Sequence, residues 1–527
     1  MRIAVIGAGP SGLVFQKELR EAGFDAECFD AASAIGGVFA RPYDGARLTS
    51  SNLTTSFSDL PPEDLTPRIW NFDEYLAYLN RYIAHFELGP RIHLNTPVTR
   101  LARDGEGFAV TLGGEGASRG VLRFDRVAIC TGTHAETVMP QWPGAETFGG
   151  QIIHSRRFEH ADVYAGKRVV IVGGGESGSD ICLEVARVAA ATVVSLRGQF
   201  GHLVHRNRSE LSDRFPDVGA SDLDTSRIHH MLPHWLGPHI ANHRSRQGLK
   251  FARAADLPVL EFLSAIKLQQ GSSSLTDFGT KNASVARAII EHGCQRKPAI
   301  ARFRPDGVEF IDGTFFAADV VICATGYRPA FPYLAPELAR FGQDALRPRE
   351  NLYRHCFHPE LGDRVAFGGY ARPAFGAIPP ISEMQARWFA LLCRGEVKLP
   401  RADRMRLTIT ADDLMARRQF PAHAQRLASL TDFLRILDQL AGEIGCRPEG
   451  LRFRDPRLWW KALSAPIMGA QFRLVGPGAK PEIAAPALRA AAVDYDLLPW
   501  FIALAVGGEL LGRVPGLGGL RPAVPWI

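Results

Sequence analysis

The sequence predicts an α/β protein with two separate parallel sheets, one inserted into the other, and a mainly helical C-terminal extension. Three observations lead to this prediction. An apolar strand, a glycine-rich turn and a helical pattern follow one another at Arg2 and again at Arg168. Two later apolar strands, "RVAIC" and "DVVICATGY", each run into Thr-Gly. A length of 527 residues favours two or three domains over a single core.

The composition is that of an ordinary soluble protein, with 46% hydrophobic and 22% charged residues. Its formal charge of +6 is spread along the chain, which disfavours nucleic acid and suits an anionic cofactor. The eight cysteines are far apart, with no C-x-x-C and no signal peptide before the first strand, so a reducing cytoplasm is expected. The most apolar stretch, "LLPWFIALAVGG", is too short to span a bilayer but leaves contact with a membrane surface open. We predict no metal site, because Pro233 interrupts the helix that would align His230 with His234.

The first element is the motif "RIAVIGAGPSGLVFQKEL". Gly7 permits the tight turn, Gly9 lets a pyrophosphate approach the backbone, and Gly12 lets the helix pack against the strand. The next strand ends in Asp30, twenty-three residues after Gly7, where an acid binds ribose hydroxyls. This arrangement predicts a Rossmann-like dinucleotide site, with an ordinary glycine-rich turn as the weaker alternative.

A second motif, "RVVIVGGGESGSD", repeats the plan with Gly173, Gly175 and Gly178. Its second strand, "TVVSLRG", places Arg197 twenty-four residues after Gly173. An acid at this point repels a 2′-phosphate, whereas a guanidinium pairs with it, so the first site suits FAD and the second NADPH. A solvated surface arginine is the alternative interpretation of Arg197.

The two strands that run into Thr-Gly indicate where the chain passes between the two folds. We expect a first part of the FAD-binding domain over 1–157, an inserted NADPH-binding domain over 158–327, a second part of the FAD-binding domain over 328–400, and a partly helical extension over 401–527. The extension ends in the Gly/Pro-rich tail "GRVPGLGGLRPAVPWI", which cannot be a long helix. We expect an extended arm lying on the body, on a second copy of the chain, or on a membrane surface, and a homo-oligomer is left open.

The linker before the second fold reads "FGGQIIHSRRF", in which Phe148, Gly150, His154 and Phe158 fill the pattern F-x-G-x-x-x-H-x-x-x-[F/Y]. With this motif the chain resembles the flavin-containing monooxygenases, which are class B flavoprotein monooxygenases. Further stretches are similar to that family, namely "IGGVF", "FSDLPPED", "ATGYRPAFPYL", "PPISEMQARW" and "QFRLVGPG". The resemblance covers nearly the whole chain and is weakest over residues 209–287.

The resemblance implies that NADPH reduces FAD and that the reduced flavin captures O2 as a C4a-hydroperoxide. This species would transfer one oxygen atom to a nitrogen or sulfur atom of a small molecule. The cofactor supplies the chemistry, so no protein nucleophile is required. A Baeyer–Villiger ketone oxygenation is the alternative, disfavoured because the fingerprint of those enzymes has tryptophan where this chain has Phe158. A non-oxygenating flavoprotein reductase or oxidase is the second alternative.

Two departures from the family pattern concern the flavin. The family places an asparagine about ten residues before the aspartate of F-S-D, whereas this chain has Thr49 there and its nearest asparagine is Asn52. We predict that Thr49 and Asn52, on a flavin-facing loop, are the catalytic candidates, with Ser50 also able to supply hydrogen bonds. Phe39 replaces the family's tryptophan and has no N–H donor.

The predicted cofactor-binding residues lie in the loops that these motifs place near the two dinucleotides. They are Gly7, Ala8, Gly9, Pro10, Ser11, Gly12, Asp30, Gly37, Val38, Phe39, Ser50, Ser51, Thr131, Gly132, His154, Gly173, Gly175, Glu176, Ser177, Gly178, Ser179, Asp180, Arg197, Thr325 and Gly326. His154 suits a hinge or packing role better than a catalytic acid.

Two helical patterns outside these loops also give testable expectations. The helix starting at Phe72 has core spacing over Phe72, Leu76, Leu79, Ile83 and Phe86. Elsewhere, Glu383 and Arg387 stand four residues apart, which favours a helix-surface ion pair and a ligand contact about equally.

Overall fold

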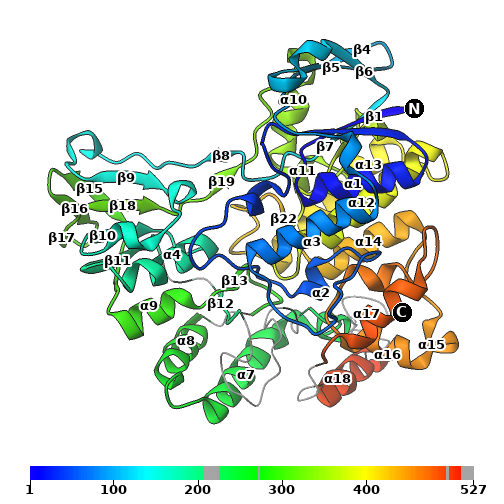
Figure 1. Cartoon of the computed structure of the whole chain (residues 1–527). Helices are drawn as coiled ribbons and strands as arrows, with labels where there is room; N and C mark the ends of the chain where they lie inside the picture. The colour runs from blue at the N-terminus through cyan, green and yellow to red at the C-terminus, as the bar shows by residue number, and fades with distance from the viewer. Residues whose placement is uncertain are drawn as a thin grey trace.

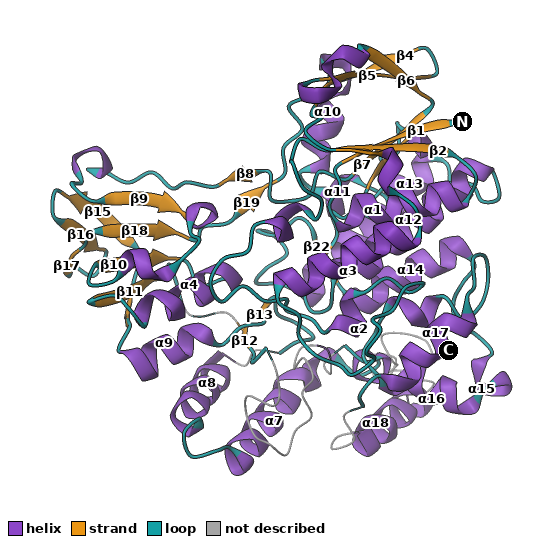
Figure 2. Cartoon of the chain, viewed as in Figure 1, coloured by secondary structure: helices purple, strands orange, loops and turns teal. Residues whose placement is uncertain are grey.

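The computed structural model describes residues 1–198, 200, 202–206, 222, 225–270, 273–493 and 498–511 (Figures 1 and 2). Its first sheet is parallel throughout and contains, in spatial order, β20 (Val365–Phe367), β7 (Arg126–Ile129), β1 (Arg2–Ile6), β2 (Asp25–Phe29) and β3 (Ile92–His93). Its second sheet, also parallel, contains β14 (Gln295–Lys297), β11 (Ala191–Ser195), β10 (Arg168–Val172), β18 (Val320–Cys323) and β9 (Gln151–His154). The prediction of an α/β protein with two Rossmann-like cores is confirmed.

The second sheet is inserted into the first in sequence. Every strand of the second sheet lies between β7 and β20 along the chain. The two crossings run side by side between the sheets, where β8 (Glu136–Thr137) pairs antiparallel with β19 (Tyr327–Arg328) (Figure 1). Because β9 belongs to the second sheet, that sheet begins ahead of residue 158, the boundary expected from the sequence.

The central strands are apolar because both faces of each sheet are covered. Along β1 the side chains alternate, so Ile3 and Val5 join one hydrophobic cluster while Ala4 and Ile6 join another. Along β10 the side chains alternate in the same way, so Val169 and Ile171 join one hydrophobic cluster while Val170 and Val172 pack in another. Helices α1 (Pro10–Glu21) and α4 (Glu176–Ala186) follow the two central strands directly.

Helix α3 (Phe72–His85) begins at a capping box, in which Asn71 and Glu74 exchange side-chain and backbone hydrogen bonds. It buries Tyr75, Tyr78, Leu79 and Tyr82, whereas Phe72, Leu76, Ile83 and Phe86 are half-buried. The predicted core stripe is therefore rotated toward the tyrosines. These large rings pack on Phe57 and Trp70, and the Tyr78 hydroxyl accepts the Phe57 N–H at 2.7 Å.

Smaller elements surround the two sheets. Two antiparallel sheets contain β4 (Val98–Asp104), β5 (Gly107–Leu112) and β6 (Val121–Phe124), and β15 (Ile300–Arg304), β16 (Gly307–Phe310) and β17 (Phe315–Ala317). The inserted part also holds β12 (His202–Leu203), α6 (Arg227–His230), α7 (Gly237–Phe251), α8 (Leu257–Gln270), β13 (Gly279–Thr280) and α9 (Ser284–His292). After β19 come α10 (Pro336–Ala345), α11 (Pro348–Asn351), β21 (Arg372–Pro373) and α12 (Ile378–Arg394).

The C-terminal extension is mainly helical over the described residues. It contains α13 (Ala402–Gln419), β22 (Leu430–Thr431), α14 (Phe433–Ile444), α15 (Leu451–Arg454), α16 (Pro456–Ser464), α17 (Pro481–Ala490) and α18 (Leu498–Leu511). Helix α14 packs into the same hydrophobic cluster as α1 and α12, so the extension covers the first sheet's helical layer (Figure 2). The tail over 512–527 and most of 207–224 lie outside the described residues. Within the described part, no helix combines the length and hydropathy needed to cross a bilayer.

Candidate functional sites at the two glycine turns

The turn between β1 and α1 requires glycine at two positions for steric reasons. Gly7 has φ of 106°, and a Cβ there would lie 2.5 Å from the Cys130 carbonyl oxygen. A Cβ on Gly12 would lie 1.7 Å from the Gly7 carbonyl oxygen. Strand, turn and helix therefore approach one another more closely than any side chain permits.

The first turn presents uncapped backbone beside a second glycine segment. Helix α1 starts without a side-chain cap and without an acid in its first turn, so its N-terminal N–H groups suit an anion. The Gly36 N–H donates to the Ala8 carbonyl, and a Cβ on Gly9 would meet the Gly37 Cα at 3.7 Å. Asp30 accepts the Ala8 N–H at 2.6 Å. These residues fit a dinucleotide whose pyrophosphate lies against bare backbone.

Several other residues predicted for this site already have protein partners. The Ser11 hydroxyl lies 2.9 Å from that of Ser382, and the Thr131 hydroxyl lies 2.9 Å from that of Tyr370. Phe39 packs edge-on against Tyr75, with ring centroids 4.8 Å apart. Three further residues predicted for this site carry no hydrogen-bonding side chain. They are Pro10 at the first position of α1, Val38 with 47% exposure, and Gly132 with φ of 75°.

The loop that carries the catalytic candidates leads into α2 (Asn52–Thr55). Asn52 is fully buried, and its amide donates to the Thr66 carbonyl at 3.0 Å and accepts the Arg68 N–H at 3.0 Å. Its polar atoms therefore hold the neighbouring chain segment. Ser50 bonds to Thr55 at 2.7 Å, and Thr49 is half-buried. This geometry gives Asn52 a supporting position in the loop.

Asp222 contacts this loop although no sequence motif indicated it. Its carboxylate accepts the Ser51 N–H at 2.7 Å and the Thr54 hydroxyl at 3.1 Å. Burial raises the pKa of Asp222, and its Oδ1 atom has no hydrogen-bond partner among the described residues. The contact joins positions more than 160 residues apart, so local patterns carry no signal for it.

The turn between β10 and α4 repeats the first turn. Gly173 has φ of 108°, and a Cβ there would lie 2.5 Å from the Ala324 carbonyl oxygen. A Cβ on Gly178 would lie 2.2 Å from the Gly173 carbonyl oxygen, while one on Gly175 would meet nothing within 4 Å. Helix α4 also lacks a side-chain cap, but unlike α1 it has an acid, Glu176, in its first turn. The open face at Gly175 suits a second phosphate-bearing ligand.

The acids in the first turns of α4 are held by cations and amides of the inserted part. Asp180 accepts from Arg206 at 2.9 Å and from Asn282 at 2.6 Å. Glu176 accepts the Lys281 N–H at 2.7 Å, and burial raises the pKa of Glu176. Burial likewise lowers the pKa of Lys281, whose ammonium group donates to the Gly376 carbonyl at 3.2 Å. Sequence reasoning missed Lys281 and Asn282, which stand in no motif.

The other residues predicted for the second site separate into exposed and structural positions. Arg197 is exposed just after β11. The His154 Nε2 atom lies 3.0 Å from the Gly326 carbonyl oxygen, and its Nδ1 atom accepts the Arg156 N–H at 3.0 Å. Burial lowers the pKa of His154, which supports a neutral packing residue. The Thr325 hydroxyl donates to the Val138 carbonyl, Ser179 is fully buried, and Ser177 lies in the first turn of α4.

Comparisons with known proteins point to one group of enzymes. A family model described as flavin-binding monooxygenase-like matches residues 1–492. The chain is 34% identical over 481 residues to a 4-hydroxybenzoate brominase (decarboxylating) of Pseudoalteromonas luteoviolacea (strain 2ta16), covering 90% of each chain. It is 31% identical over 499 residues to flavin-containing monooxygenase 5 of Mus musculus, covering 90% of this chain and 89% of the relative.

Solved structures share the fold at lower sequence identity. The S-allyl-L-cysteine S-oxygenase of Allium sativum superposes with a TM-score of 0.58 at 21% identity, covering 92% of this chain and 97% of that one. The cyclohexanone monooxygenase of Rhodococcus sp. Phi1 bound to NADP+ has a TM-score of 0.60 at 16% identity, covering 84% and 97%. At these identities the likeness concerns the fold alone.

Proposed function

Because the chain belongs to the flavin-binding monooxygenase-like family, we propose that it transfers one oxygen atom from O2 to a soft nucleophile, nitrogen or sulfur, of a small molecule. Its cofactors are FAD and NADPH, as in the rest of the family. The observation that supports the proposal best is the pair of matching glycine turns, one followed by Asp30 and the other by Arg197. Two turns of one geometry with opposite charges suit two different dinucleotides.

We assign FAD to the first turn. Gly9 and the N-terminus of α1 would bind the pyrophosphate, and Asp30 would bind a ribose hydroxyl. FAD supplies the redox chemistry and O2 activation once bound, so the protein has to bind, orient and exclude water. In this proposal the Thr49 hydroxyl hydrogen-bonds the reactive face of the flavin, while Asn52 keeps the loop in place through Thr66 and Arg68.

NADPH is assigned to the second turn. Gly175 offers open backbone, and Arg197 is exposed where it can reach a 2′-phosphate. Arg206 is buried against Asp180, so Arg197 is the better partner for that phosphate.

The proposal is tested with purified protein by measuring bound flavin, NADPH oxidation, O2 uptake and product together. One FAD per chain is expected, with NADPH consumption stimulated by an amine, sulfide or hydroxylamine and matched by oxygenated product. Lactone or ester formation from a ketone would instead establish the Baeyer–Villiger alternative. If all electrons appear as hydrogen peroxide with every substrate class, the protein is a non-oxygenating oxidase.

A second candidate function follows from the brominase relatives. Identity to the two 4-hydroxybenzoate brominases is 34% and 32%, against 31% for flavin-containing monooxygenase 5. Bromide is also a soft nucleophile, so oxygen transfer to it would give hypobromite. Hypobromite would then brominate an electron-rich phenolic acid, with CO2 leaving as the replaced group.

Two cations near the second turn favour an acidic substrate in this case. Arg372 stacks on Phe278, 4.5 Å from the ring centroid. The nearby Glu176 carboxyl acts electrostatically on both Arg372 and Lys281, but among the described residues neither cation forms an ion pair with it or with another carboxylate. The test supplies 4-hydroxybenzoate, NADPH and O2 with and without bromide. Bromide-dependent release of CO2 and a brominated phenol would support it, and a product that is independent of bromide would reject it.

A further inference from the structure

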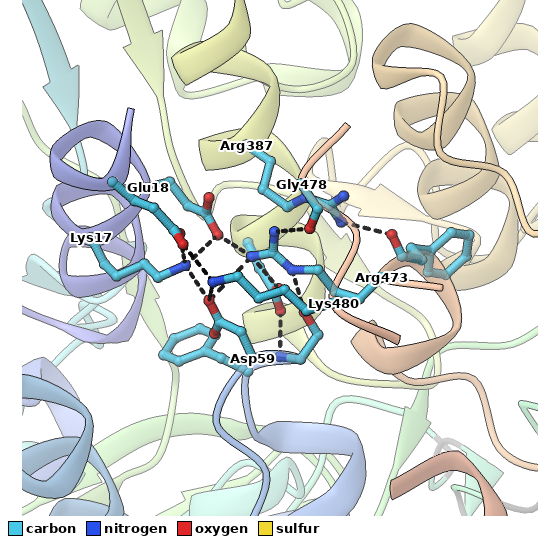
Figure 3. A network of polar contacts seen from close by, with 12 residues as sticks. Lys17, Glu18, Asp59, Arg387, Arg473, Gly478 and Lys480 are labelled. Atoms are coloured by element: carbon cyan, nitrogen blue, oxygen red, sulfur yellow. Dashed lines mark hydrogen bonds and ion pairs between the residues drawn. The ribbon is translucent and has the colours of Figure 1, made fainter. Parts of the chain in front are cut away.

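A buried network of charges joins the C-terminal extension to the part of the chain that carries the first glycine turn (Figure 3). At its centre is Arg473, in the stretch "QFRLVGPG", with a side-chain exposure of 1%. It lies between α1, the loop at residues 57–59 and α12, as Figure 3 shows.

The Arg473 guanidinium uses each of its nitrogens on a different segment. Nε donates to the Ser58 hydroxyl at 2.8 Å, and Nη1 donates to the Gly478 carbonyl at 3.0 Å. Nη2 contacts the Glu18 carboxylate of α1 and lies 3.2 Å from Glu383 of α12. Such a planar fork can hold three segments in one geometry, which a lysine cannot do.

Further charged residues extend these contacts. Lys17 pairs with Asp59 and, at 3.1 Å, with Glu18, while Lys480 lies 3.4 Å from Asp59. Arg387 of α12 donates to the Phe472 and Pro477 carbonyls at 2.8 and 2.9 Å, beside Arg473. The prediction of a surface ion pair between Glu383 and Arg387 is therefore wrong. Both side chains are buried and bind other groups.

The network is balanced in charge. Its cations are Lys17, Arg387, Arg473 and Lys480, and its anions are Glu18, Glu21, Asp59 and Glu383. Three of the carboxylates lie close enough together to hold a metal ion, but Lys17 and Arg473 point their charges at them. Burial alone would raise the pKa of Asp59, yet Lys17 and Arg473 lower it to about 2, so the carboxylate stays charged.

Each segment held by Arg473 leads to the proposed FAD site. Ser58 and Asp59 follow the loop of Thr49 and α2. Glu18 belongs to the helix whose first turn is the glycine turn. Ser382, adjacent to Glu383, contacts Ser11 in that first turn at 2.9 Å.

We infer that Arg473 is a positioning residue through which the C-terminal extension sets the geometry of the FAD site. The inference rests on the proposed assignment of FAD to the first glycine turn. It gives residues 472–480 a part in flavin binding although they are more than 400 residues from the turn in sequence.

The test compares three purified variants with the wild-type holoenzyme. Arg473→Lys keeps the charge but loses the fork, and the double variant Arg473→Met/Glu383→Gln keeps the network neutral. Arg489→Met is the matched control, because Arg489 lies in the same extension but forms an exposed pair with Asp455. We expect the dissociation constant for FAD to rise at least tenfold in the first two variants and to stay unchanged in the control. The absorption band and fluorescence of bound flavin should also shift toward those of free flavin.

The outcomes separate positioning from mere stabilisation. If both Arg473 variants have a lower melting temperature but wild-type FAD affinity and flavin spectrum, the network stabilises the fold only and the inference is overturned. If wild-type protein binds no FAD, the proposed function fails instead, whatever the variants do.

Discussion

Asp30 and Arg197 end equivalent strands of the two sheets with opposite charges, and this single difference makes a testable assignment of cofactor preference. Replacing Arg197 by alanine removes a charge-assisted hydrogen bond of roughly 1.5–3 kcal/mol, so NADPH use should weaken by about ten- to a hundredfold. NADH use should change little. Steady-state kinetics with both nucleotides measures this, and Arg187→Ala, which removes an exposed arginine paired with Glu184, is the control. Equal loss with both nucleotides would make Arg197 structural.

Replacing Thr49 or Asn52 by alanine is predicted to affect different properties, namely the coupling of NADPH oxidation to oxygen transfer for Thr49 and the stability of the fold for Asn52. Thr49→Ala should divert more NADPH electrons to hydrogen peroxide, because the hydroxyl proposed to face the flavin is removed. Asn52→Ala should lower the free energy of unfolding by about 1–3 kcal/mol, because the Thr66 carbonyl and the Arg68 N–H lose their hydrogen bonds to the buried Asn52 amide. Calorimetry and the ratio of peroxide to NADPH measure both effects. Unchanged coupling in Thr49→Ala would remove that hydroxyl from the mechanism.

Single residues were predictable where a local motif fixes them. Gly7, Gly12, Gly173 and Gly178 could be read from spacing because a Cβ at each would overlap a carbonyl oxygen. Asp222 could not, because its contacts to Ser51 and Thr54 come from a distant part of the chain with no recognisable pattern.

At the scale of elements, the two glycine turns predict a reciprocal experiment. Gly9→Val should give nearly colourless protein, because a valine side chain would cover the backbone at Gly9 against which we propose that the FAD pyrophosphate lies. Gly175→Val should keep its flavin but lose reduction of that flavin by NADPH. Visible absorption before and after anaerobic NADPH addition distinguishes the two. Each variant controls for the other, and flavin loss in Gly175→Val alone would reverse the assignment.

Helix faces were predicted less well than helix positions. The sequence locates a helix at Phe72, yet the buried face is the tyrosine face, because periodicity does not show which neighbours will be aromatic. Likewise the spacing of Glu383 and Arg387 is compatible with a surface pair, but their partners come from the 58–59 loop and from residues 472–478. Only the assembled fold brings these segments together.

At the scale of the whole molecule, the insertion of one sheet into the other was predictable from the order of the motifs. The strands beside the two glycine turns and the two returning strands follow one another along the chain as β1, β2, β7, β10, β11 and β18. Topology rules therefore group the first three strands into one sheet and the last three into the other. The contribution of the C-terminal extension was not predictable: the stretch "QFRLVGPG" around Arg473 resembles the family, but its partners on α1, the 57–59 loop and α12 are distant in sequence.

Stability should fall on mild acidification because His355 is buried beside Arg349 and Arg354. Burial, with these arginines, lowers the pKa of His355 from 6.5 to about 3. Between pH 3 and pH 6.5 the His355 side chain is protonated in the unfolded chain but neutral in the folded chain. The stability that His355 contributes is therefore complete above pH 6.5 and decreases as the pH falls toward 3. Lowering the pH from 7 to 5 should therefore reduce the free energy of unfolding by about 2 kcal/mol through His355.

Urea unfolding at the two pH values measures this contribution. His355→Asn is the informative variant, since asparagine does not titrate and tolerates the φ of 55° at this position. It should lose less stability on acidification than wild type. An identical loss in both proteins would assign the acid sensitivity to other groups.

The discontinuous first sheet also constrains how the protein is made. A ribosome releases the chain from its N-terminus, so the glycine turn at Gly7 emerges long before β20 completes the sheet and before Arg473 reaches α1. The second sheet, by contrast, is contiguous over 151–323 and can close while synthesis continues. With FAD at the first turn, as proposed, we expect FAD loading to be a late event in biosynthesis, and a chain that stalls before residue 473 would carry a folded second sheet but an unfinished flavin site.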